Sequence, residues 1–378
     1  MRVFLIAGEA SGDALGGALM SGLRALREDL VFDGVGGPLM QAQGLTSRFE
    51  MSELSVMGIA EVLPKYRHLK RRIAEMADAV LETQPDVLIT IDSPDFCLRV
   101  AKLVKAKSNI RTVHYVAPSV WAWRPKRAVK MAKCIDHVLA LLPFEPPYME
   151  AAGMACDFVG HPVVTEPVAT DKEASAFRIA HNIPPTSQIL LVLPGSRRGE
   201  VQRLTPIFGK TIELFSLVSK PPTLVLVRAP SVAGLVDEIT ADWPVQPIMV
   251  SGDDLSAKRA VFKGADVALA ASGTVALELA ATATPMVIGY TMNWLSYRLI
   301  QRAALIDRVN LVNIVTDTYH VPECLGPECT PDRLAQELQN VLNDPCAQIK
   351  TMSKTMQALG AGGEAPGIRA ATAVLARM

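Results

Sequence analysis

Short apolar runs without polar alternation recur along the chain, and segments with helical periodicity separate them. The predicted strands among these runs are Val3–Ala7, Val31–Val35, Asp86–Ile91, Thr112–Val116, Val138–Leu141, Ile189–Leu193, Thr223–Val227, Asp266–Ala270 and Pro285–Gly289. Strands that are apolar on both faces are typical of parallel sheets covered by helices on both sides. The pattern therefore predicts an α/β protein with doubly wound parallel sheets.

The strand, glycine loop and helix that open the chain recur near its middle. The first copy reads VFLIAGEASGDALGGAL and the second reads ILLVLPGSRRGEVQRL. Between them, residues 162–171 combine prolines with small and polar residues, which is typical of a linker. We therefore expect two Rossmann-like domains, at residues 1–165 and 166–344, whose sheets face a cleft. We expect the helices of residues 345–378 to return to the first domain.

The composition excludes several classes of protein. The 378 residues include 38 basic and 38 acidic side chains, so the overall charge gives no reason to expect a nucleic-acid partner. The first apolar run is shorter than a signal-peptide core, and no stretch of about eighteen apolar residues follows, so we expect no membrane span. The cysteines are scattered, and we expect reduced thiols. His320, Cys324 and Cys329 fit no standard zinc site, so no metal is expected.

The first motif, Gly8–Asp13, directly follows a predicted strand and opens a helix. Its glycines let a ligand approach the backbone, and the N-terminus of the helix favours an anion. The motif is not the dinucleotide-binding fingerprint G-x-G-x-x-G. Asp13 could also be a plain helix cap, and Glu9 could orient a loop.

The second motif, Ile91–Phe96, ends a buried strand of the same domain. Ligands of such sheets gather at this edge, and a carboxylate beside an apolar wall could serve as a general base. Asp92 is the better candidate because it directly continues the strand. Asp95 follows Pro94 and could cap the next helix.

Two turns in the second domain have the composition of phosphate-binding loops. Pro194–Glu200 places backbone N–H groups, a hydroxyl and a guanidinium near one helix N-terminus, which suits a diphosphate. Ala271–Glu278 supplies a second turn of this kind, followed by a carboxylate that could take a ribose diol. The candidate phosphate- and ribose-binding residues are Gly195, Ser196, Arg197, Ser272, Gly273, Thr274 and Glu278.

Two segments combine apolar or aromatic residues with cations. In the segment 56–72, apolar residues precede Pro64 and basic residues follow it. This pattern indicates a segment that binds the membrane surface. The alternative is a solvated basic face over a buried helix. In the segment 118–133, two tryptophans beside basic residues indicate packing, an interfacial surface or, less well supported, a site for single-stranded nucleic acid. The candidate surface residues are Val56, Met57, Ile59, Arg71, Arg72, Trp121 and Trp123.

Taken together, these segments resemble the lipid-A-disaccharide synthase family. The matching segments, in the order of the family, are GEASGD (Gly8–Asp13), VMGIAEVL (Val56–Leu63), IDSPDF (Ile91–Phe96), HYVAPSVWAWR (His114–Arg124), LPFE (Leu142–Glu145), VGHP (Val159–Pro162), LPGSR (Leu193–Arg197) and ASGTVALE (Ala271–Glu278).

The resemblance implies a GT-B fold whose first domain faces the acceptor and the membrane and whose second domain binds a UDP-sugar. It implies an inverting transfer from UDP-2,3-diacylglucosamine to 2,3-diacylglucosamine 1-phosphate, giving the β-1,6-linked lipid A disaccharide 1-phosphate and UDP. Members of the family look like cofactor-free peripheral proteins on the cytoplasmic face of the bacterial inner membrane, often homodimeric. A UDP-N-acetylglucosamine 2-epimerase and a non-catalytic carrier of acylated sugars are the alternatives.

The resemblance also implies roles for single residues. Asp92 would take the proton from the acceptor 6-hydroxyl, Glu9 would lie near the reacting sugars, and Arg197 would neutralise the departing UDP. The second turn and Glu278 would contact the nucleotide, and Asn313 would contact the donor. The residues implied on the acceptor and acyl-chain side are Ser11, Val56, Met57, Ile59, Arg71, Arg72, Trp121 and Trp123.

The chain departs from the family pattern at three positions. Trp294 and Val312 stand where the family usually has proline, and Thr165 stands where an acidic residue is common. These departures touch the loops expected around the donor and leave the proposed base unchanged.

Overall fold

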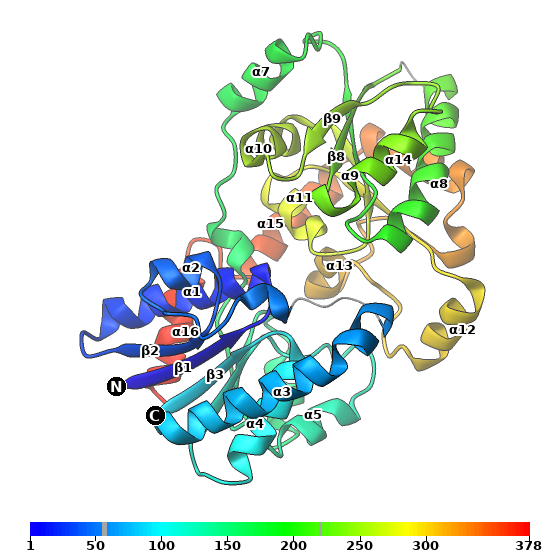
Figure 1. Cartoon of the computed structure of the whole chain (residues 1–378). Coiled ribbons are helices and arrows are strands. Elements are labelled where there is room, and N and C mark those ends of the chain that lie inside the picture. Colours follow the sequence, from blue (N-terminus) through cyan, green and yellow to red (C-terminus); the bar gives the residue numbers. More distant parts are fainter. Residues whose placement is uncertain (55–58, 219–220) are drawn as a thin grey trace. The chain divides into compact units, whose positions relative to one another are not determined.

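The structure, a computed structural model, describes residues 1–54, 59–218 and 221–378. The chain divides into two compact units (Figure 1). Unit 1 comprises Met1–Thr165 and Leu359–Met378, and unit 2 comprises Glu166–Ala358. Each unit is built on a six-stranded sheet in which all the neighbouring strands run parallel. The predicted α/β class with two parallel sheets is confirmed.

Unit 1 alternates strands and helices. Its strands are β1 (Arg2–Ala7), β2 (Val31–Val35), β3 (Val87–Ile91), β4 (Arg111–Tyr115), β5 (His137–Ala140) and β6 (Ala155–Phe158). Its α-helices are α1 (Ala10–Leu26), α2 (Pro38–Ala42), α3 (Ile59–Thr83), α4 (Pro94–Lys105), α5 (Lys126–Met131), α6 (Pro146–Glu150) and α16 (Pro366–Leu375). Two short 3-10 helices are η1 (Met51–Glu53) and η2 (Pro162–Thr165).

The strand order of unit 1 creates a switch point. The order is β2-β1-β3-β4-β5-β6, so the chain runs outward from β1 to β2 and then returns to β3 on the other side of β1. One face of the sheet packs on α3 to α6, and the other face packs on α1, α2 and α16. At such a switch point the loops after β1 and β3 diverge and leave a crevice for ligands.

Unit 2 repeats this design. Its strands are β7 (Ile189–Leu193), β8 (Thr223–Arg228), β9 (Ile248–Ser251), β10 (Val267–Ala271), β11 (Met286–Tyr290) and β12 (Glu323–Leu325). Its α-helices are α7 (Asp171–Ala180), α8 (Arg198–Val218), α9 (Ala233–Thr240), α10 (Leu255–Gly264), α11 (Val275–Ala281), α12 (Trp294–Ala303), α13 (Leu311–Thr316), α14 (Pro331–Asn343) and α15 (Cys346–Ala358), with 3-10 helices η3 (Pro230–Val232) and η4 (Gly326–Glu328). The order β12-β11-β10-β7-β8-β9 places the switch point between β7 and β10.

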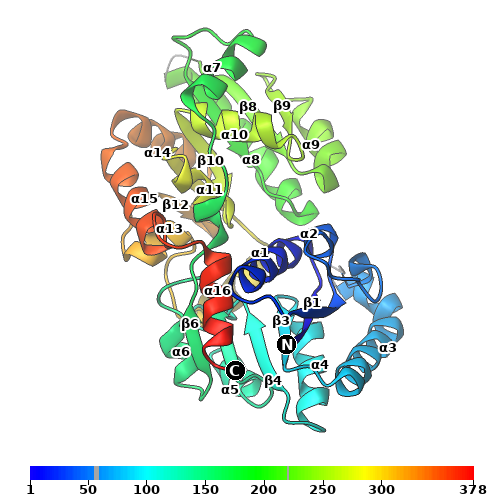
Figure 2. The ribbon, with the colours of Figure 1, turned by 90° about the vertical axis from the view of Figure 1, so that its left-hand side faces the viewer.

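The last helix of the chain completes unit 1. Helix α16 packs along α1, as Figure 2 shows. A Cβ atom added at Gly22 would lie 2.4 Å from the carbonyl oxygen of Gly367, so the two helices approach more closely than any other residue would allow. Arg369 strengthens the attachment, because its guanidinium donates to the carbonyl oxygen of Phe158 at 2.8 Å.

The C-terminal helices differ from the expectation. Helix α15 packs on α11 and α13 of unit 2, and α16 alone returns to unit 1. Unit 2 therefore ends at Ala358, whereas the sequence predicts its end at residue 344. The glycines of residues 360–363 separate α15 from α16, but both segments are helical by sequence. Only the tertiary contacts show which unit each helix joins.

Three strands, β6, β9 and β12, are absent from the predicted set. Each lies at an edge of its sheet and has three or four residues. Edge strands are half solvated and lack the continuous apolar run that identifies a central strand. The predicted strands agree with the observed ones to within one residue at either end.

Candidate active site

The loops that follow β1 and β3 meet at the switch point of unit 1. A Cβ atom added to Gly8 would lie 2.5 Å from Ser93 Oγ, so glycine permits this close approach. Glu9 takes the N-cap position of α1 in an extended backbone conformation. The predicted carboxylates Glu9 and Asp92 therefore belong to adjacent loops at the carboxyl ends of the strands, where α/β proteins bind their ligands.

The backbone at Asp92 has a conformation that residues other than glycine rarely adopt. The φ angle is 49° at Asp92 and 40° at Ser93, and it is 86° at Val116 after the neighbouring strand. The Asp92 N–H donates to the carbonyl oxygen of Tyr115 at 3.0 Å, which ties the loop to β4. Such residues cost roughly 1–3 kcal/mol each and cluster at functional sites. This strain supports the interpretation of Asp92 as a functional residue.

A cavity of about 360 Å³ opens beside these loops. The described residues that line it are Glu9, Leu54, Leu69, Lys70, Ile73, Ser93, Pro94, Asp95, Phe96 and Arg99. Glu9 thus lines the cavity directly, and Asp92 immediately precedes a lining residue. Ser11 is exposed on the first turn of α1 and is not one of the lining residues.

Asp13 has a structural task. Its buried carboxylate accepts hydrogen bonds from the N–H groups of Gly37 at 2.9 Å, Leu39 at 2.9 Å and Met40 at 3.0 Å. These groups lie at the N-terminus of α2, where they have no partner within the helix. Asp13 therefore caps the neighbouring helix α2 and holds it against α1.

Trp121 is buried, which does not fit the predicted membrane contact. Its Nε1–H donates to Glu145 Oε1 at 3.2 Å, and its ring packs edge to face on Phe144 with centroids 5.1 Å apart. Burial raises the pKa of Glu145 to about 7. Trp123 is 38% exposed, and the Arg124 guanidinium lies 4.1 Å from the centroid of its ring. Of the two tryptophans, Trp123 is the one available to a surface partner.

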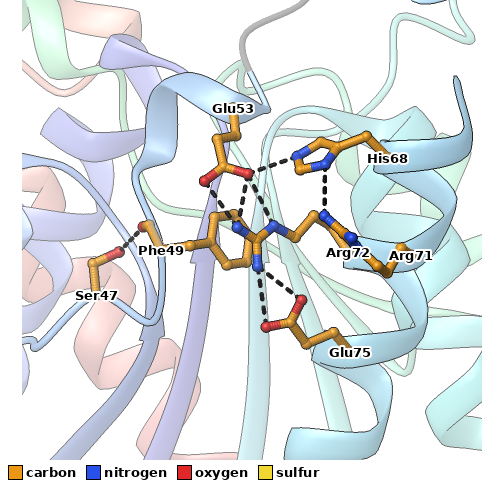
Figure 3. Close-up of polar contacts among 7 residues, drawn as sticks. All are labelled: Ser47, Phe49, Glu53, His68, Arg71, Arg72 and Glu75. Carbon is orange, nitrogen blue, oxygen red and sulfur yellow. Dashed lines mark hydrogen bonds and ion pairs between the residues drawn. The ribbon is translucent and has the colours of Figure 1, made fainter. Parts of the chain in front are cut away.

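Arg72 is held by internal contacts (Figure 3). Its guanidinium donates to Glu53 from Nε and Nη2, both at 2.9 Å, and to Glu75 from Nη1 at 2.8 Å. Its Cζ atom lies 4.2 Å from the centroid of the Phe49 ring. The three nitrogens and one face of the guanidinium are therefore engaged, and Arg72 fastens η1 to α3. Its predicted lipid contact stays a prediction.

The other predicted surface residues of this segment have different outcomes. Arg71 is exposed, and its Nη2 lies 3.1 Å from Nδ1 of His68 (Figure 3). Val56 and Met57 lie outside the described residues. Ile59 is the first residue of α3, and its side chain also lies outside the described part of the structure.

Arg72→Ala is expected to lower the free energy of unfolding by roughly 2 kcal/mol, because hydrogen bonds to charged groups contribute about 1.5–3 kcal/mol. Urea unfolding followed by circular dichroism measures this loss. The matched control is Arg71→Ala on the exposed neighbouring position, where we expect a change of about 0.5 kcal/mol or less. Equal stability of the two variants would contradict the structural role of Arg72.

The candidate phosphate- and ribose-binding residues of unit 2 converge on one cavity at the switch point between β7 and β10. This cavity has a volume of about 470 Å³. The described residues that line it are Leu193, Gly195, Ser196, Arg197, Glu200, Val227, Ala229, Pro230, Gly252, Lys258, Phe262, Ala271, Ser272, Gly273, Thr274, Val275 and Glu278. All seven residues predicted from the two turns are among them.

The first turn presents an exposed cation on a fixed backbone. Gly195 has a φ of 106°, and a Cβ atom added there would lie 2.8 Å from Glu200 Oε2. Arg197 is 69% exposed, and its Nη1 donates to Glu200 Oε1 at 3.1 Å. The turn leads into the 21-residue helix α8, whose N-terminus favours an anion. A diphosphate would therefore meet both a guanidinium and a helix N-terminus here.

The second turn has a partner that the sequence does not identify. Glu278 forms an ion pair with Lys258, which reaches it from α10. The ammonium of Lys258 also lies 5.3 Å from the centroid of the Phe262 ring. A Cβ atom added at Gly273 would meet no atom within 4 Å, so this glycine faces open space. The cavity thus offers a lysine, a carboxylate and an aromatic ring beside an open turn.

Asn313 does not join the residues that line this cavity. Its Nδ2 donates to the carbonyl oxygen of Val321 at 2.8 Å and to Glu323 Oε1 at 2.7 Å, and its Oδ1 accepts from the Val321 N–H at 3.0 Å. The amide is buried and fastens α13 to β12. The structure therefore gives Asn313 a structural role, and its predicted contact with the donor stays a prediction.

Lys70, Arg99 and Lys258 are residues of these sites that the sequence alone does not identify. Lys70 is one cation in a run of several, and the partner of Lys258, Glu278, is distant in sequence. The sequence gives a weak indication for Arg99. It follows Phe96 by three residues on the helix after the Asp92 loop, so the two side chains share one face of that helix.

Among residues 1–54, 59–218 and 221–378, no helix is long and apolar enough to cross a membrane. The same residues contain no group of three or more histidine, cysteine, aspartate or glutamate side chains placed to hold a metal ion.

Solved structures with the same fold include sugar-nucleotide enzymes. The UDP-GlcNAc 2-epimerase from Neisseria meningitidis, bound to UDP-GlcNAc, is 11% identical, with a TM-score of 0.63 over 100% of this chain and 99% of that one. A glycosyltransferase from Rickettsia africae is 12% identical, with a TM-score of 0.56 over 99% and 97% of the two chains. At this level of identity the likeness shows a shared fold, which is the predicted GT-B architecture.

Sequence relatives define the family. The family model described as lipid-A-disaccharide synthetase matches residues 3–373. The lipid-A-disaccharide synthase of Ruegeria pomeroyi is 60% identical over 384 aligned positions, which cover 100% of this chain and 96% of the relative. The chain therefore belongs to the lipid-A-disaccharide synthase family, the glycosyltransferases that assemble the lipid A disaccharide.

Proposed function

We propose that the chain transfers 2,3-diacylglucosamine, with inversion, from UDP-2,3-diacylglucosamine to 2,3-diacylglucosamine 1-phosphate. The products are the β-1,6-linked disaccharide 1-phosphate and UDP. In this proposal unit 2 holds the donor nucleotide and unit 1 holds the acceptor. Family membership supports the reaction class, and the assignment of substrates to units rests on the chemistry of the two switch-point sites.

The observation that carries the proposal is the chemistry at these two sites. Unit 2 places Arg197, Lys258 and two open turns around one cavity, which is suited to a sugar nucleotide. The Neisseria meningitidis epimerase of the same fold binds UDP-GlcNAc, which supports this kind of ligand. Unit 1 places the carboxylates of Glu9 and Asp92 on the adjacent loops of its switch point. A glycosyl transfer needs both a site for a leaving diphosphate and a base.

The proposed reaction is a single displacement. The 6-hydroxyl oxygen of the acceptor attacks the anomeric carbon of the donor, the bond from that carbon to the UDP oxygen breaks, and the hydroxyl proton passes to Asp92. Charge develops on the departing diphosphate, and the N-terminus of α8 with Arg197 stabilises it. These groups can provide the charge relief that a divalent metal provides in other transferases.

We propose that the protein acts at the cytoplasmic face of the bacterial inner membrane as a peripheral protein and as a homodimer. Both substrates carry acyl chains, and Trp123 with Arg124 forms an exposed aromatic and cationic pair of the kind found at membrane interfaces. Sedimentation with vesicles that contain anionic phospholipid tests the first statement. Light scattering of the purified protein tests the second.

The deciding experiment incubates the purified protein in detergent with both acylated substrates and follows UDP together with the lipid product. We expect UDP release that depends strictly on the acceptor, with one disaccharide 1-phosphate formed per UDP. Release of UDP without the acceptor would identify a donor hydrolase. Absence of UDP from folded, donor-binding protein would favour a carrier of acylated sugars.

Arg197→Ala is expected to raise the KM for the donor by about ten- to a hundredfold, because a charge-assisted contact to phosphate contributes about 1.5–3 kcal/mol. The KM for the acceptor should stay unchanged. The matched control is Arg198→Ala, because Arg198 is also exposed and is not a lining residue of the cavity. Unchanged donor kinetics in the Arg197 variant would remove this residue from the proposed site.

A further inference from the structure

The cavity of unit 1 combines apolar walls with two cations, and it is separate from the donor cavity of unit 2. We propose that it binds the acceptor lipid. Lys70 and Arg99 contact the 1-phosphate, and Leu69, Ile73 and the other apolar lining residues receive the beginning of an acyl chain. This inference rests on the proposed function and names the acceptor site for it.

The walls of the cavity come from two helices that lie side by side (Figure 1). Leu69 and Ile73 are one turn apart on α3, and Phe96 and Arg99 are one turn apart on α4, so each pair shares a helix face. Leu54 adds another apolar side chain to the lining. The result is an amphipathic lining, which fits a ligand with an acyl chain at one end and a charged group at the other.

The two cations are available to a ligand. Within the described part of the chain, neither Lys70 nor Arg99 forms an ion pair with a carboxylate, whereas Arg72 on the next position of α3 is fully engaged by Glu53 and Glu75. Two cations beside an apolar wall, neither of them in an ion pair within the described residues, can both contact an anion, and a phosphate monoester matches both an ammonium and a guanidinium. The basic run of α3 thus divides into residues that hold the fold and a residue that faces the cavity.

The phosphate in question is that of the acceptor. In the proposed function, the diphosphate of the donor is held by the turns of unit 2, so a second cationic site is needed for the other phosphate of the reaction. The carboxylates of Glu9 and Asp95 also line the cavity, where they can accept hydrogen bonds from sugar hydroxyls. The volume of about 360 Å³ is at the lower end for ligand pockets, which suits the sugar phosphate with part of one chain.

The cavity also leads to the proposed base. Ser93 lines it and directly follows Asp92, and Ser93 Oγ has no hydrogen-bond partner among the described residues. An acceptor whose phosphate is held by α3 and α4 would therefore present its sugar to the loops after β1 and β3. The cations act as binding and positioning residues, since they would touch the phosphate and not the reacting hydroxyl.

The test compares Lys70→Ala, Arg99→Ala and the double variant with wild type in the detergent assay. We expect the acceptor KM of the double variant to rise by about ten- to a hundredfold, as for the loss of charge-assisted contacts. The donor KM should not change, and kcat should change far less than the acceptor KM. Lys102→Ala, on the exposed side of α4 outside the cavity, is the matched control and should resemble wild type.

A second arm identifies the group that the cations contact. With 2,3-diacylglucosamine, which lacks the 1-phosphate, wild type and the double variant should have the same acceptor KM, since the contact is already lost. A double variant that still discriminates between the two acceptors as wild type does would overturn the proposal. If it instead loses binding to anionic phospholipid vesicles while its acceptor KM is unchanged, the cavity serves a membrane phospholipid and the proposal is wrong.

Different results would refute the proposed function and the acceptor cavity. If wild type releases no UDP, the proposed function fails. If wild type turns over normally and the folded double variant has an unchanged acceptor KM, the acceptor cavity alone is refuted. Circular dichroism and thermal melting establish that each variant is folded, which we expect because neither cation forms an ion pair with another described residue.

Discussion

Asp92→Asn is expected to lower kcat by about a hundred- to ten-thousandfold, the range typical for loss of a general base, while UDP still binds. The amide has nearly the same shape as the carboxylate, and asparagine tolerates the left-handed backbone found here, with a φ of 49°. The substitution therefore removes the proton acceptor and leaves the loop in place. Steady-state kinetics for turnover and calorimetry for UDP measure the two effects separately.

Asp95→Asn is the comparison for this variant. Asp95 lies on the exposed first turn of α4 and lines the proposed acceptor cavity, so its loss should act on the acceptor KM more than on kcat. Near-normal turnover in a folded Asp92 variant would exclude Asp92 as the base. Glu9→Gln would then become the next variant to measure, because Glu9 belongs to the adjacent loop and lines the same cavity.

Glu145→Gln is expected to change how the stability of the protein depends on pH. Burial raises the pKa of Glu145 from an ordinary value of 4.5 to about 7. A carboxyl group whose pKa is raised by folding binds more protons in the folded state, so it stabilises the fold below pH 4.5 and this contribution is lost as the pH rises towards 7. The shift corresponds to roughly 3 kcal/mol across that window.

The slope of stability against pH is the quantity to compare. Glutamine has one acceptor oxygen, so it can keep the hydrogen bond from Trp121 or the one from the Leu142 N–H, and its stability will differ from wild type at any pH. Burial also lowers the pKa values of His114 and His161 to about 4, which makes stability rise with pH between 4 and 6.5. Because both proteins share these histidines, the difference between their curves isolates Glu145.

Urea unfolding at several pH values from 4.5 to 8 gives the two curves. We expect the wild-type free energy of unfolding to fall relative to that of the variant as the pH rises, and to level off above about pH 7. Parallel curves would mean that the carboxyl group titrates at its ordinary pKa in the folded protein. That result would also contradict its burial behind Trp121.

The central strands and the turns beside them follow from the sequence because their signals are local. A continuous apolar run followed by glycine and a helix identifies both the strand and the loop that projects from its end. The turns at Gly195 and Gly273 and the loops of Glu9 and Asp92 are predictable for this reason. Family membership confirms the fold and the reaction class but does not test the role of any single residue.

The contacts that the sequence does not predict depend on partners far away in the chain. Arg72 pairs with Glu53, and Trp121 donates to Glu145, across 19 and 24 positions. Asn313 is engaged by the segment that leads into the edge strand β12. A cation or tryptophan in a basic segment has the same local sequence whether it faces solvent or a buried carboxylate. Periodicity and motif spacing therefore cannot separate these cases.

The seating of α16 on α1 sets an order for events during synthesis. The ribosome makes most of unit 1 first, then the whole of Glu166–Ala358, and only afterwards α16, which with α1 and α2 covers one face of the first sheet. At translation rates of about 5–20 residues per second, that intervening stretch takes roughly ten to forty seconds. During this time the surface of α1 around Gly22 stays open to water, so the nascent chain carries an uncovered apolar face. Synthesis of unit 1 therefore begins first, but its folding is completed last. A chaperone that shields this face would act while unit 2 is being synthesised.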